Sequence, residues 1–329
     1  MSLKTNLIAA RTALALIVLA MALPVAATPG AGFRALTVPA QEALPALSGA
    51  VWSPCAVAPS PIQVGPFVLA ATRDCPLAGK KMPLIVMSHG RTGTYLGHRD
   101  TALALAAAGF LVASISHPGD NAQDSARTDD LSAFVDRPAD IRRLLDYLLG
   151  PWSQAAAIDA DRIGFFGFSR GGYTGLVIVG ANPSFGRNIR LCAGKTDSTC
   201  EDVRHGALAP LAHDARVKAA VIADPLSIFF TKESFADVRV PIQLWRSELG
   251  GDGVTPASVA FVAQSLPVSP DFHTVANAGH FAFLPPCPPA LASQMSDICT
   301  DPPGFERAEF HRQFNAAVVD FFRRALPGD

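Results

Sequence analysis

Strand-length apolar runs alternate with helix-length segments from Met82 onward, and this alternation restricts the fold more than any other feature of the chain. A mostly parallel sheet with helices on both faces requires such an order. The expected strands are Leu84–Ser88, Phe110–Ser116, Ile163–Phe168, Val217–Ala223, Ile242–Arg246 and Phe272–Ala276. The expected helices are Arg99–Ala108, Pro138–Leu149, Gly171–Val179, Pro256–Ser265 and Glu306–Leu326. The sequence therefore predicts an α/β fold.

Two parts of the chain lie outside this alternation. Up to about residue 80 the sequence is rich in Pro, Ala and Gly, with one strand candidate at Pro66–Ala71, which indicates early antiparallel strands and loops. The segment Asn182–His213 is too long for a tight connection between a helix and a strand. We expect it to be an insertion above the sheet.

The first 27 residues have the pattern of a signal peptide. A start with Lys4 and Arg11 precedes the apolar run Thr12–Leu23, and the small residues Val25-Ala26-Ala27 follow. The alternative, an uncleaved membrane anchor, needs about 20 apolar residues, more than this run contains. The sequence predicts cleavage after Ala27, export to the periplasm or the medium, and one domain over residues 28–329.

Composition argues against two classes of partner. The net charge is −1 with 17% charged residues, and no Lys/Arg-rich run provides a surface for nucleic acid or for an anionic membrane. After the signal segment no stretch is apolar and long enough to span a bilayer, so we expect no stable membrane insertion. The oligomeric state stays open.

All six cysteines follow the predicted cleavage site, and an even number in an exported protein favours disulfides. Pairing between sequence neighbours closes three short loops, so we expect that pairing among the fifteen that six cysteines allow. The expected pairs are Cys55 with Cys75, Cys192 with Cys200, and Cys287 with Cys299. None has the spacing of a metal site, and we expect neither a metal nor a cofactor.

The strongest chemical motif is Gly167-Phe168-Ser169-Arg170-Gly171, directly after an expected strand and before an expected helix. Glycines on both sides of a serine permit a turn so sharp that larger side chains would collide there. The turn lifts the hydroxyl away from the sheet, and the helix that follows adds its positive end. The pattern indicates a nucleophile elbow with Ser169 as nucleophile.

A serine hydroxyl needs a neighbouring imidazole to become a strong nucleophile, and on such a scaffold that base comes late in the chain. His280 follows the last expected strand, in a loop that can turn its ring over the edge of the sheet. His273 lies inside that strand, and we interpret it as a structural or surface residue. The sequence therefore predicts His280 as the base.

The acidic partner of His280 is ambiguous, because three carboxylates lie between Ser169 and His280 at the ends of expected strands. Asp252 precedes Gly-Val-Thr-Pro and a helix, the position that the order Ser, acid, His favours. Asp224 ends the preceding strand, and Glu248 lies in the same loop as Asp252. We predict Asp252, with Asp224 as the alternative and Glu248 behind both.

An oxyanion is stabilised by backbone N–H groups that already point at the developing charge. The residue after the nucleophile, Arg170, supplies one, and the loop that begins Ser88-His89-Gly90-Arg91 supplies the other. We predict the N–H groups of Arg91 and Arg170. The turn His117–Asp120 ends a neighbouring strand at the same edge, and we interpret its His and Asp as structural.

These motifs together resemble the α/β-hydrolase superfamily over about residues 60–325. Within it, the chain looks similar to secreted dienelactone-hydrolase-like proteins, platelet-activating-factor acetylhydrolases and bacterial polyester hydrolases. The resemblance rests on His89-Gly90, the motif around Ser169, the turn at 117–119 and Ala278-Gly279-His280-Phe281. It implies Ser169 as nucleophile, His280 as base, and Arg91 and Arg170 as oxyanion donors.

The chain departs from these relatives at two points. Dienelactone hydrolases carry cysteine where this chain has Ser169, so their lactone substrate does not transfer with the resemblance. Acetylhydrolase-like relatives place the acid at Asp224, whereas the polyester-hydrolase and dienelactone-hydrolase patterns place it at Asp252.

We expect this sequence to encode a cofactor-free serine esterase acting on small, lipid or polyester esters through a Ser-His-Asp triad. Amidase, lactonase and cofactor-free peroxidase chemistry are alternatives on the same scaffold, and a binding protein that kept the elbow as a turn is another. Labelling of the protein by a fluorophosphonate probe would exclude the hypothesis of a non-catalytic binding protein.

Cleavage of the signal peptide gives a first test. The exported protein should begin at Thr28, as measured by its intact mass, because small residues at 25 and 27 fit the signal peptidase. Ala27→Phe should block processing. An exported wild-type protein that retains residues 1–27 contradicts the prediction.

Overall fold

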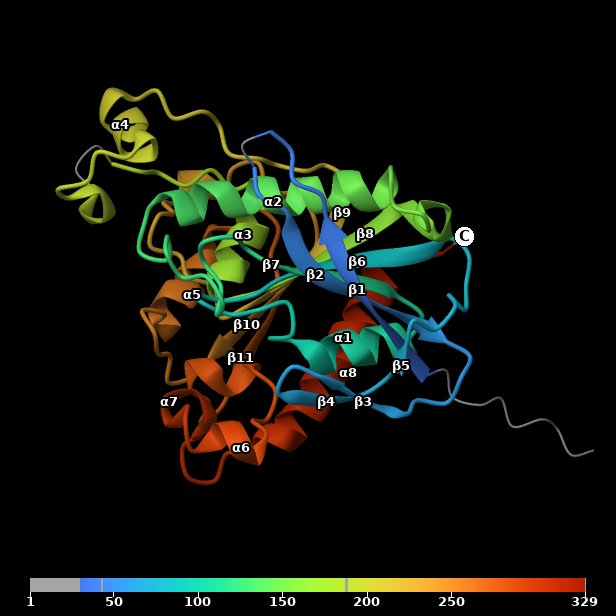
Figure 1. Ribbon diagram of the computed structural model, residues 1–329. Coiled ribbons are helices and arrows are strands. Elements are labelled where there is room, and N and C mark those ends of the chain that lie inside the picture. Colours follow the sequence, from blue (N-terminus) through green and yellow to red (C-terminus); the bar gives the residue numbers. More distant parts are fainter. Residues whose placement is uncertain (1–29, 43, 187–188, 329) are drawn as a thin grey trace, which may run out of the picture.

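The computed structural model describes residues 30–42, 44–186 and 189–328 (Figure 1). The expected signal peptide, residues 1–27, lies outside these residues. In the described part of the chain, the elements form a nine-stranded sheet with strand order β11-β10-β9-β8-β6-β7-β2-β1-β5. Strands β6 to β11 run parallel to one another, whereas β2 is antiparallel to both β7 and β1. The expected α/β fold is confirmed.

The strands of this sheet are β1 (Gly30–Val38), β2 (Leu47–Cys55), β5 (Thr72–Arg73), β6 (Met82–Ser88), β7 (Leu111–Ser116), β8 (Ile158–Phe168), β9 (Val217–Ala223), β10 (Ile242–Ser247) and β11 (Asp271–Val275). A separate hairpin joins β3 (Pro61–Val64) to β4 (Phe67–Ala70). The helices are α1 (Arg99–Ala107), α2 (Ser132–Leu149), α3 (Arg170–Ile178), α4 (Ser198–His205), α5 (Pro256–Ser265), α6 (Pro289–Ala292), α7 (Ser296–Cys299) and α8 (Arg307–Ala325).

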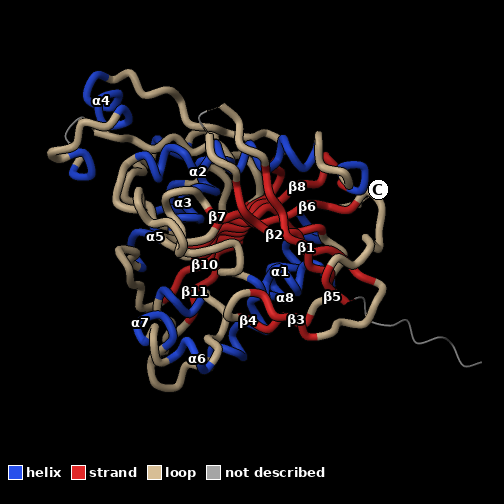
Figure 2. The backbone as a smooth tube through the Cα atoms, viewed as in Figure 1, coloured by secondary structure: helices blue, strands red, loops and turns tan. Residues whose placement is uncertain are grey.

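Helices cover both faces of the sheet, as a parallel sheet requires (Figures 1 and 2). Helices α2, α3 and α5 pack on one face and α1 and α8 on the other, and each face has its own apolar core. The central strand β8 belongs to both cores, because buried Phe165 faces one of them and buried Phe166 the other.

The order of the strands brings the ends of β6 and β8 together. From β6 the chain crosses through α1 to β7 on one side, and then returns through α2 to β8 on the other side of β6. At such a switch point the two connections diverge to opposite faces, and the carboxyl ends of the strands are left open. The loop after β6 and the elbow after β8 therefore lie side by side.

Helix α2 differs from the expectation, which started it at Pro138. It begins at Ser132, and Pro138 lies inside it. Proline fits best in the first turn of a helix because its nitrogen has no hydrogen to donate, so Pro138 had suggested the start. The additional turns bury Phe134 and Arg137 against the rest of the protein, and this burial outweighs the lost hydrogen bond.

The insertion Asn182–His213 contains α4, which extends beyond the sheet (Figure 1). All three cysteine pairs predicted from sequence proximity are confirmed, and Cys192–Cys200 lies in this insertion. Among the described residues no helix combines the length and the apolar character needed to cross a membrane.

A partly buried group of hydrogen bonds ties α1 to α8. His311 Nδ1 on α8 lies 2.6 Å from Asp100 Oδ2 on α1, and Asn315 Nδ2 donates to the same oxygen at 3.0 Å. The other ring nitrogen of His311 lies 2.9 Å from the carbonyl oxygen of Ala282, in the turn that follows β11. Burial alone would raise the pKa of Asp100, but His311 and Asn315 outweigh it and lower that pKa to about 2.

The Cys55–Cys75 disulfide should contribute most through the unfolded chain, since it closes the longest of the three loops, with a sequence separation of 20. Replacing both cysteines with alanine should lower the free energy of unfolding by about 3 kcal/mol. Urea denaturation measures this, and peptide mapping without reductant should recover the three neighbour pairs. Any crossed pair in the map contradicts the assignment.

Asp100→Asn should destabilise the protein in a pH-dependent way. A carboxyl group whose pKa is lowered on folding stabilises the native state above its ordinary pKa of 3.8, and this contribution is lost as the pH falls through about 2. The variant should therefore lose about 1–2 kcal/mol at pH 7, and the difference from wild type should shrink below pH 4.

Urea denaturation at pH 7 and pH 3 tests this expectation. Asp320→Asn is the matched control, because Asp320 is an exposed carboxylate on α8 that lies 3.9 Å from Arg323. The control should change stability little at either pH. An equal loss for Asp100→Asn at both pH values would show that its charge does not stabilise the fold.

Candidate active site

Ser169 lies at the turn between β8 and α3 in a backbone conformation that side chains rarely adopt, with φ 55° and ψ −118°. Gly167 and Gly171 make this turn possible. A Cβ at Gly167 would lie 2.2 Å from the carbonyl oxygen of Gly171, and a Cβ at Gly171 would lie 2.0 Å from that of Ser88. Both positions exclude any other residue, which explains the motif seen in the sequence.

His280 lies in the turn after β11 and is buried. Its Nδ1 is 2.7 Å from Oδ2 of Asp224, and its ring stacks on Phe168 with the centroids 4.7 Å apart. Nε2 is buried and has no hydrogen-bond partner among the described residues. Because Asp224 accepts from Nδ1–H, the lone pair of the imidazole is on Nε2, which is the arrangement of a general base.

The carboxylate against His280 is thus that of Asp224, the alternative acid, and not that of Asp252. Asp224 directly follows β9 and is fully buried, and Ser247 binds it with both its backbone N–H at 2.9 Å and its hydroxyl at 2.7 Å. These donors hold the carboxylate toward the imidazole. Asp252 instead lies exposed in a tight glycine-rich turn at φ 47°.

The other two residues weighed in the sequence have structural contacts. Glu248 accepts the backbone N–H of Asn277 at 2.6 Å and so supports the left-handed turn at that residue. His273 stacks on Trp245 with the ring centroids 4.1 Å apart, and its Nε2 lies 2.9 Å from Asp271. Neither side chain has a recorded contact with His280 among the described residues.

The loop after β6 lies directly against the elbow. A Cβ at Gly90 would lie 3.3 Å from Cβ of Ser169 and 3.1 Å from the ring of Phe168, so a larger residue there would crowd the elbow. Arg91 follows this glycine, and Arg170 opens α3. Neither the Arg91 N–H nor the Arg170 N–H donates to a backbone carbonyl in the described part of the chain. Arg170 directly follows Ser169 and Arg91 directly follows Gly90, and the role of their N–H groups as oxyanion donors stays a prediction.

The side chains of these two arginines are engaged elsewhere. Arg170 donates to Asp120 and to the carbonyl of Thr128, both at 2.8 Å, and its guanidinium lies over the ring of Phe134. Arg91 pairs with exposed Asp129 at 2.9 Å. Both side chains are thus bound by carboxylates of the protein itself.

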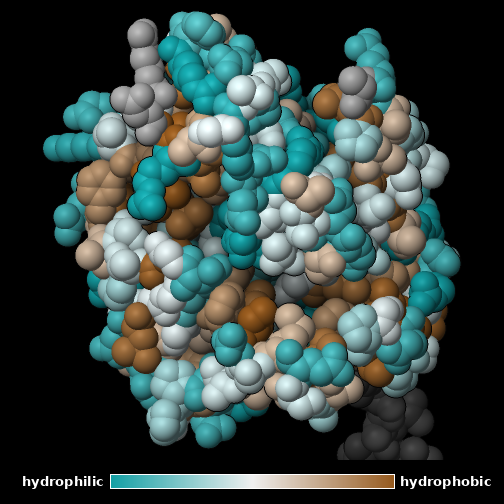
Figure 3. All heavy atoms as spheres, turned by 60° about the vertical axis from the view of Figure 1, so that its left-hand side comes forward, coloured by the Kyte–Doolittle hydropathy of each residue, from teal (hydrophilic) through white to brown (hydrophobic). Residues whose placement is uncertain are grey.

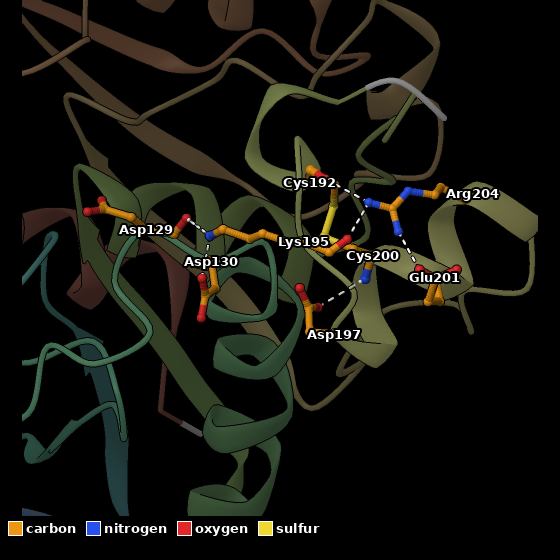
Figure 4. Close-up of a disulfide and its surroundings, with 8 residues drawn as sticks. All are labelled: Asp129, Asp130, Cys192, Lys195, Asp197, Cys200, Glu201 and Arg204. Carbon is orange, nitrogen blue, oxygen red and sulfur yellow. Dashed lines mark hydrogen bonds and ion pairs between the residues drawn. A yellow bond between two sulfur atoms is a disulfide. The ribbon is translucent and has the colours of Figure 1, made fainter.

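The insertion is attached to Asp129 and Asp130 through Lys195 (Figure 4). Lys195, between Cys192 and Cys200, donates to the carbonyl of Asp129 at 2.9 Å and pairs with Asp130. The segment 129–130 therefore has two contacts. The side chain of Asp129 pairs with Arg91, and Lys195 of the disulfide-bonded insertion binds both residues of the segment. Among the described residues no cluster of three or more His, Cys, Asp or Glu side chains has the arrangement of a metal site.

No protein-family model matches this sequence, and no curated protein matches it. The fold does match a solved structure, a ferulic acid esterase from Streptomyces cinnamoneus, with a TM-score of 0.66 over 94% of this chain and 93% of that chain. The two sequences are 20% identical. At this identity the match establishes a shared fold, of the α/β-hydrolase type that the sequence motifs predict.

Proposed function

We propose that this protein is an exported serine esterase whose residues 28–329 form one catalytic domain, with Ser169 as nucleophile, His280 as base and Asp224 as acid. The observation that carries the proposal is the 2.7 Å contact of His280 Nδ1 with Asp224, together with a buried Nε2 that has no hydrogen-bond partner within the described part of the chain. The proposal includes kinship with secreted dienelactone-hydrolase-like and acetylhydrolase-like serine esterases.

The proposed reaction is acyl transfer in two steps. Oγ of Ser169 attacks the ester carbonyl carbon while its proton passes to Nε2 of His280. The tetrahedral intermediate collapses, and the leaving alcohol takes that proton, which leaves an acyl-enzyme. Water then attacks the acyl carbon and gives a proton to Nε2, and the second collapse releases the acid and returns the proton to Ser169. Asp224 holds the ring and stabilises the imidazolium that forms twice.

The oxyanion of each tetrahedral intermediate would accept hydrogen bonds from the N–H groups of Arg91 and Arg170. Each such donor lowers the barrier by about 3–4 kcal/mol in serine hydrolases, because it is oriented before the charge develops. No cofactor or metal takes part in this scheme.

An exposed apolar residue on the loop that bonds Ser169 supports an ester with an apolar acyl or alcohol group. The backbone N–H of Leu226 donates to the carbonyl of Ser169 at 3.0 Å, and Ile228, two residues further on, is 61% exposed. The face turned forward in Figure 3 also exposes apolar side chains between hydrophilic ones. The solved structure with the same fold is named a ferulic acid esterase, so an aromatic ester such as methyl ferulate belongs in the substrate series.

Hydrolysis of p-nitrophenyl acetate, butyrate and octanoate and of methyl ferulate by the mature protein tests the proposal. Ser169→Ala and His280→Ala should lower kcat by at least about 10⁴-fold, because nucleophile and base act as a unit. Asp224→Asn should lower it by about 10²- to 10⁴-fold, since the ring loses the acceptor that orients it.

Asp252→Asn is the matched control for the acid, because the same charge is removed from an exposed turn. It should retain wild-type turnover, with folding of all variants checked by circular dichroism. Loss of activity in Asp252→Asn with retention in Asp224→Asn would reassign the acid. A folded wild type that turns over no ester and takes no fluorophosphonate label would overturn the esterase proposal, and turnover of amides or peroxide instead would redirect it.

A further inference from the structure

The turn His117-Pro118-Gly119-Asp120 ends beside the elbow, and the reaction scheme above makes no use of it. Asp120 has a side chain only 1% exposed. Its carboxylate accepts four hydrogen bonds: from Arg137 at 2.9 Å, Arg170 at 2.8 Å, the hydroxyl of Thr128 at 3.0 Å and the backbone N–H of Thr92 at 3.3 Å. A buried carboxylate with this many donors is a junction between the segments that supply them.

The four donors come from four different segments of the site. Thr92 directly follows Arg91 in the loop after β6, and Arg170 is the first residue of α3. Thr128 lies in the loop before α2, and Arg137 lies within α2. Asp120 therefore joins the loop after β6 and the start of α3 to helix α2. It also joins them to the turn after β7, to which Asp120 itself belongs.

Arg137 extends the same junction to the start of the loop after β6. Its Nη2 donates to the carbonyl oxygen of His89, immediately before Gly90. The backbone N–H of His117 donates to Nε2 of His89 at 3.1 Å, so Nδ1–H of that ring donates to the carbonyl of Gly90 at 2.7 Å. Each peptide unit leading to Arg91 is thus held by a side chain.

The histidines in this network act as neutral hydrogen-bonding groups. Burial lowers the pKa of both His89 and His117 well below the ordinary value, and the charge of Arg137 lowers both further. His117 Nε2 lies 2.9 Å from Oγ of Ser88, and Nδ1 lies 3.0 Å from Asp140. Ser88 Oγ also accepts from Arg137 Nη2 at 3.4 Å, so this second Ser-His-Asp arrangement is part of the junction and serves geometry.

The carboxylate also balances charge. Burial alone would raise the pKa of Asp120, but Arg137 and Arg170 outweigh it and lower that pKa, so the group stays ionised. Removing its charge would leave two buried guanidinium groups to repel each other across the position where they now meet. The segments that carry Thr92 and Arg170 would then separate.

We infer that Asp120 is a positioning residue for the proposed esterase, which fixes the backbone N–H groups of Arg91 and Arg170 at the spacing that the oxyanion requires. The inference rests on the proposed function and adds a residue to it. Asp120 acts through the two donor segments and does not touch the substrate.

The experiment compares Asp120→Asn with wild type in ester hydrolysis and in inhibition by phenylboronic acid, whose tetrahedral serine adduct places an oxygen at the oxyanion position. Asp120→Asn should lower kcat by about 10- to 100-fold and weaken boronate inhibition by a similar factor. The reason is that misplaced N–H groups would bind neither the oxyanion nor the boronate oxygen well. KM should change less than threefold, and the pH profile should keep its midpoint, because His280 and Asp224 are untouched.

Two further variants keep the test decisive. Asp214→Asn is the matched control: this carboxylate is also buried and pairs with an arginine, Arg216, but it lies before β9, where its N–H donates to Ile178 at the end of α3 opposite to the elbow. Asp214→Asn should lower the free energy of unfolding and leave kcat unchanged. If Asp120→Asn does not fold, Thr128→Val removes one donor to Asp120 and leaves all three charges in place. This variant should lower kcat several-fold and weaken inhibition by phenylboronic acid by a similar factor.

The outcomes separate the two proposals. An active wild type in which Asp120→Asn, or Thr128→Val in its place, keeps kcat and boronate affinity overturns the positioning role alone. A fall in kcat in which KM rises tenfold or the pH midpoint moves also overturns it, because the change would then lie in binding or in His280. A wild type without ester turnover overturns the proposed function together with this inference.

Discussion

The close approach of three backbone segments around Ser169 is the constraint on which the rest of the site depends. The end of β6, the elbow and the first turn of α3 meet without side chains between them, since a Cβ at Gly171 would lie 2.0 Å from the carbonyl oxygen of Ser88. This approach requires β6 and β8 to be neighbours with connections on opposite faces, which the strand order provides. Both glycines of the motif and Gly90 follow from the same restriction of space.

Left-handed backbone conformations gather at the ends of the strands around the site. Thr92, Ser169, Asp224 and Asp252 all have φ between 44° and 55°. Such residues cost about 1–3 kcal/mol each and persist where their surroundings determine them. The surroundings are visible at three of them: Asp120 accepts from Thr92, Ala223 and Leu226 bond the backbone of Ser169, and Ser247 donates twice to Asp224. These hydrogen bonds thus offset the backbone strain at Thr92, Ser169 and Asp224.

The sequence predicted those parts of the site that depend on local pattern. A strand, a glycine-flanked serine and a helix define the elbow within a dozen residues, and the turn with His280 follows the last strand. The acidic residue was different, because Asp224, Glu248 and Asp252 all precede His280 in chain order and the local pattern favoured Asp252. What separates them is a contact between adjacent strand ends: Ser247, the last residue of β10, binds Asp224, which directly follows β9. The start of α2 and the contacts of Asp120 likewise depend on residues distant in sequence, which periodicity does not report.

Charge is divided around Ser169 in a way that matches the proposed reaction. In the transition state the substrate oxygen becomes negative and the imidazole becomes positive. Arg137 and Arg170, with Asp120 between them, support the segments that would face the oxygen, and their formal charges sum to one positive unit. On the other side, Asp224 places its carboxylate against Nδ1 of His280. Because both arrays are buried, little solvent screens them, and the field they produce along the path of charge separation is built into the fold before any substrate arrives.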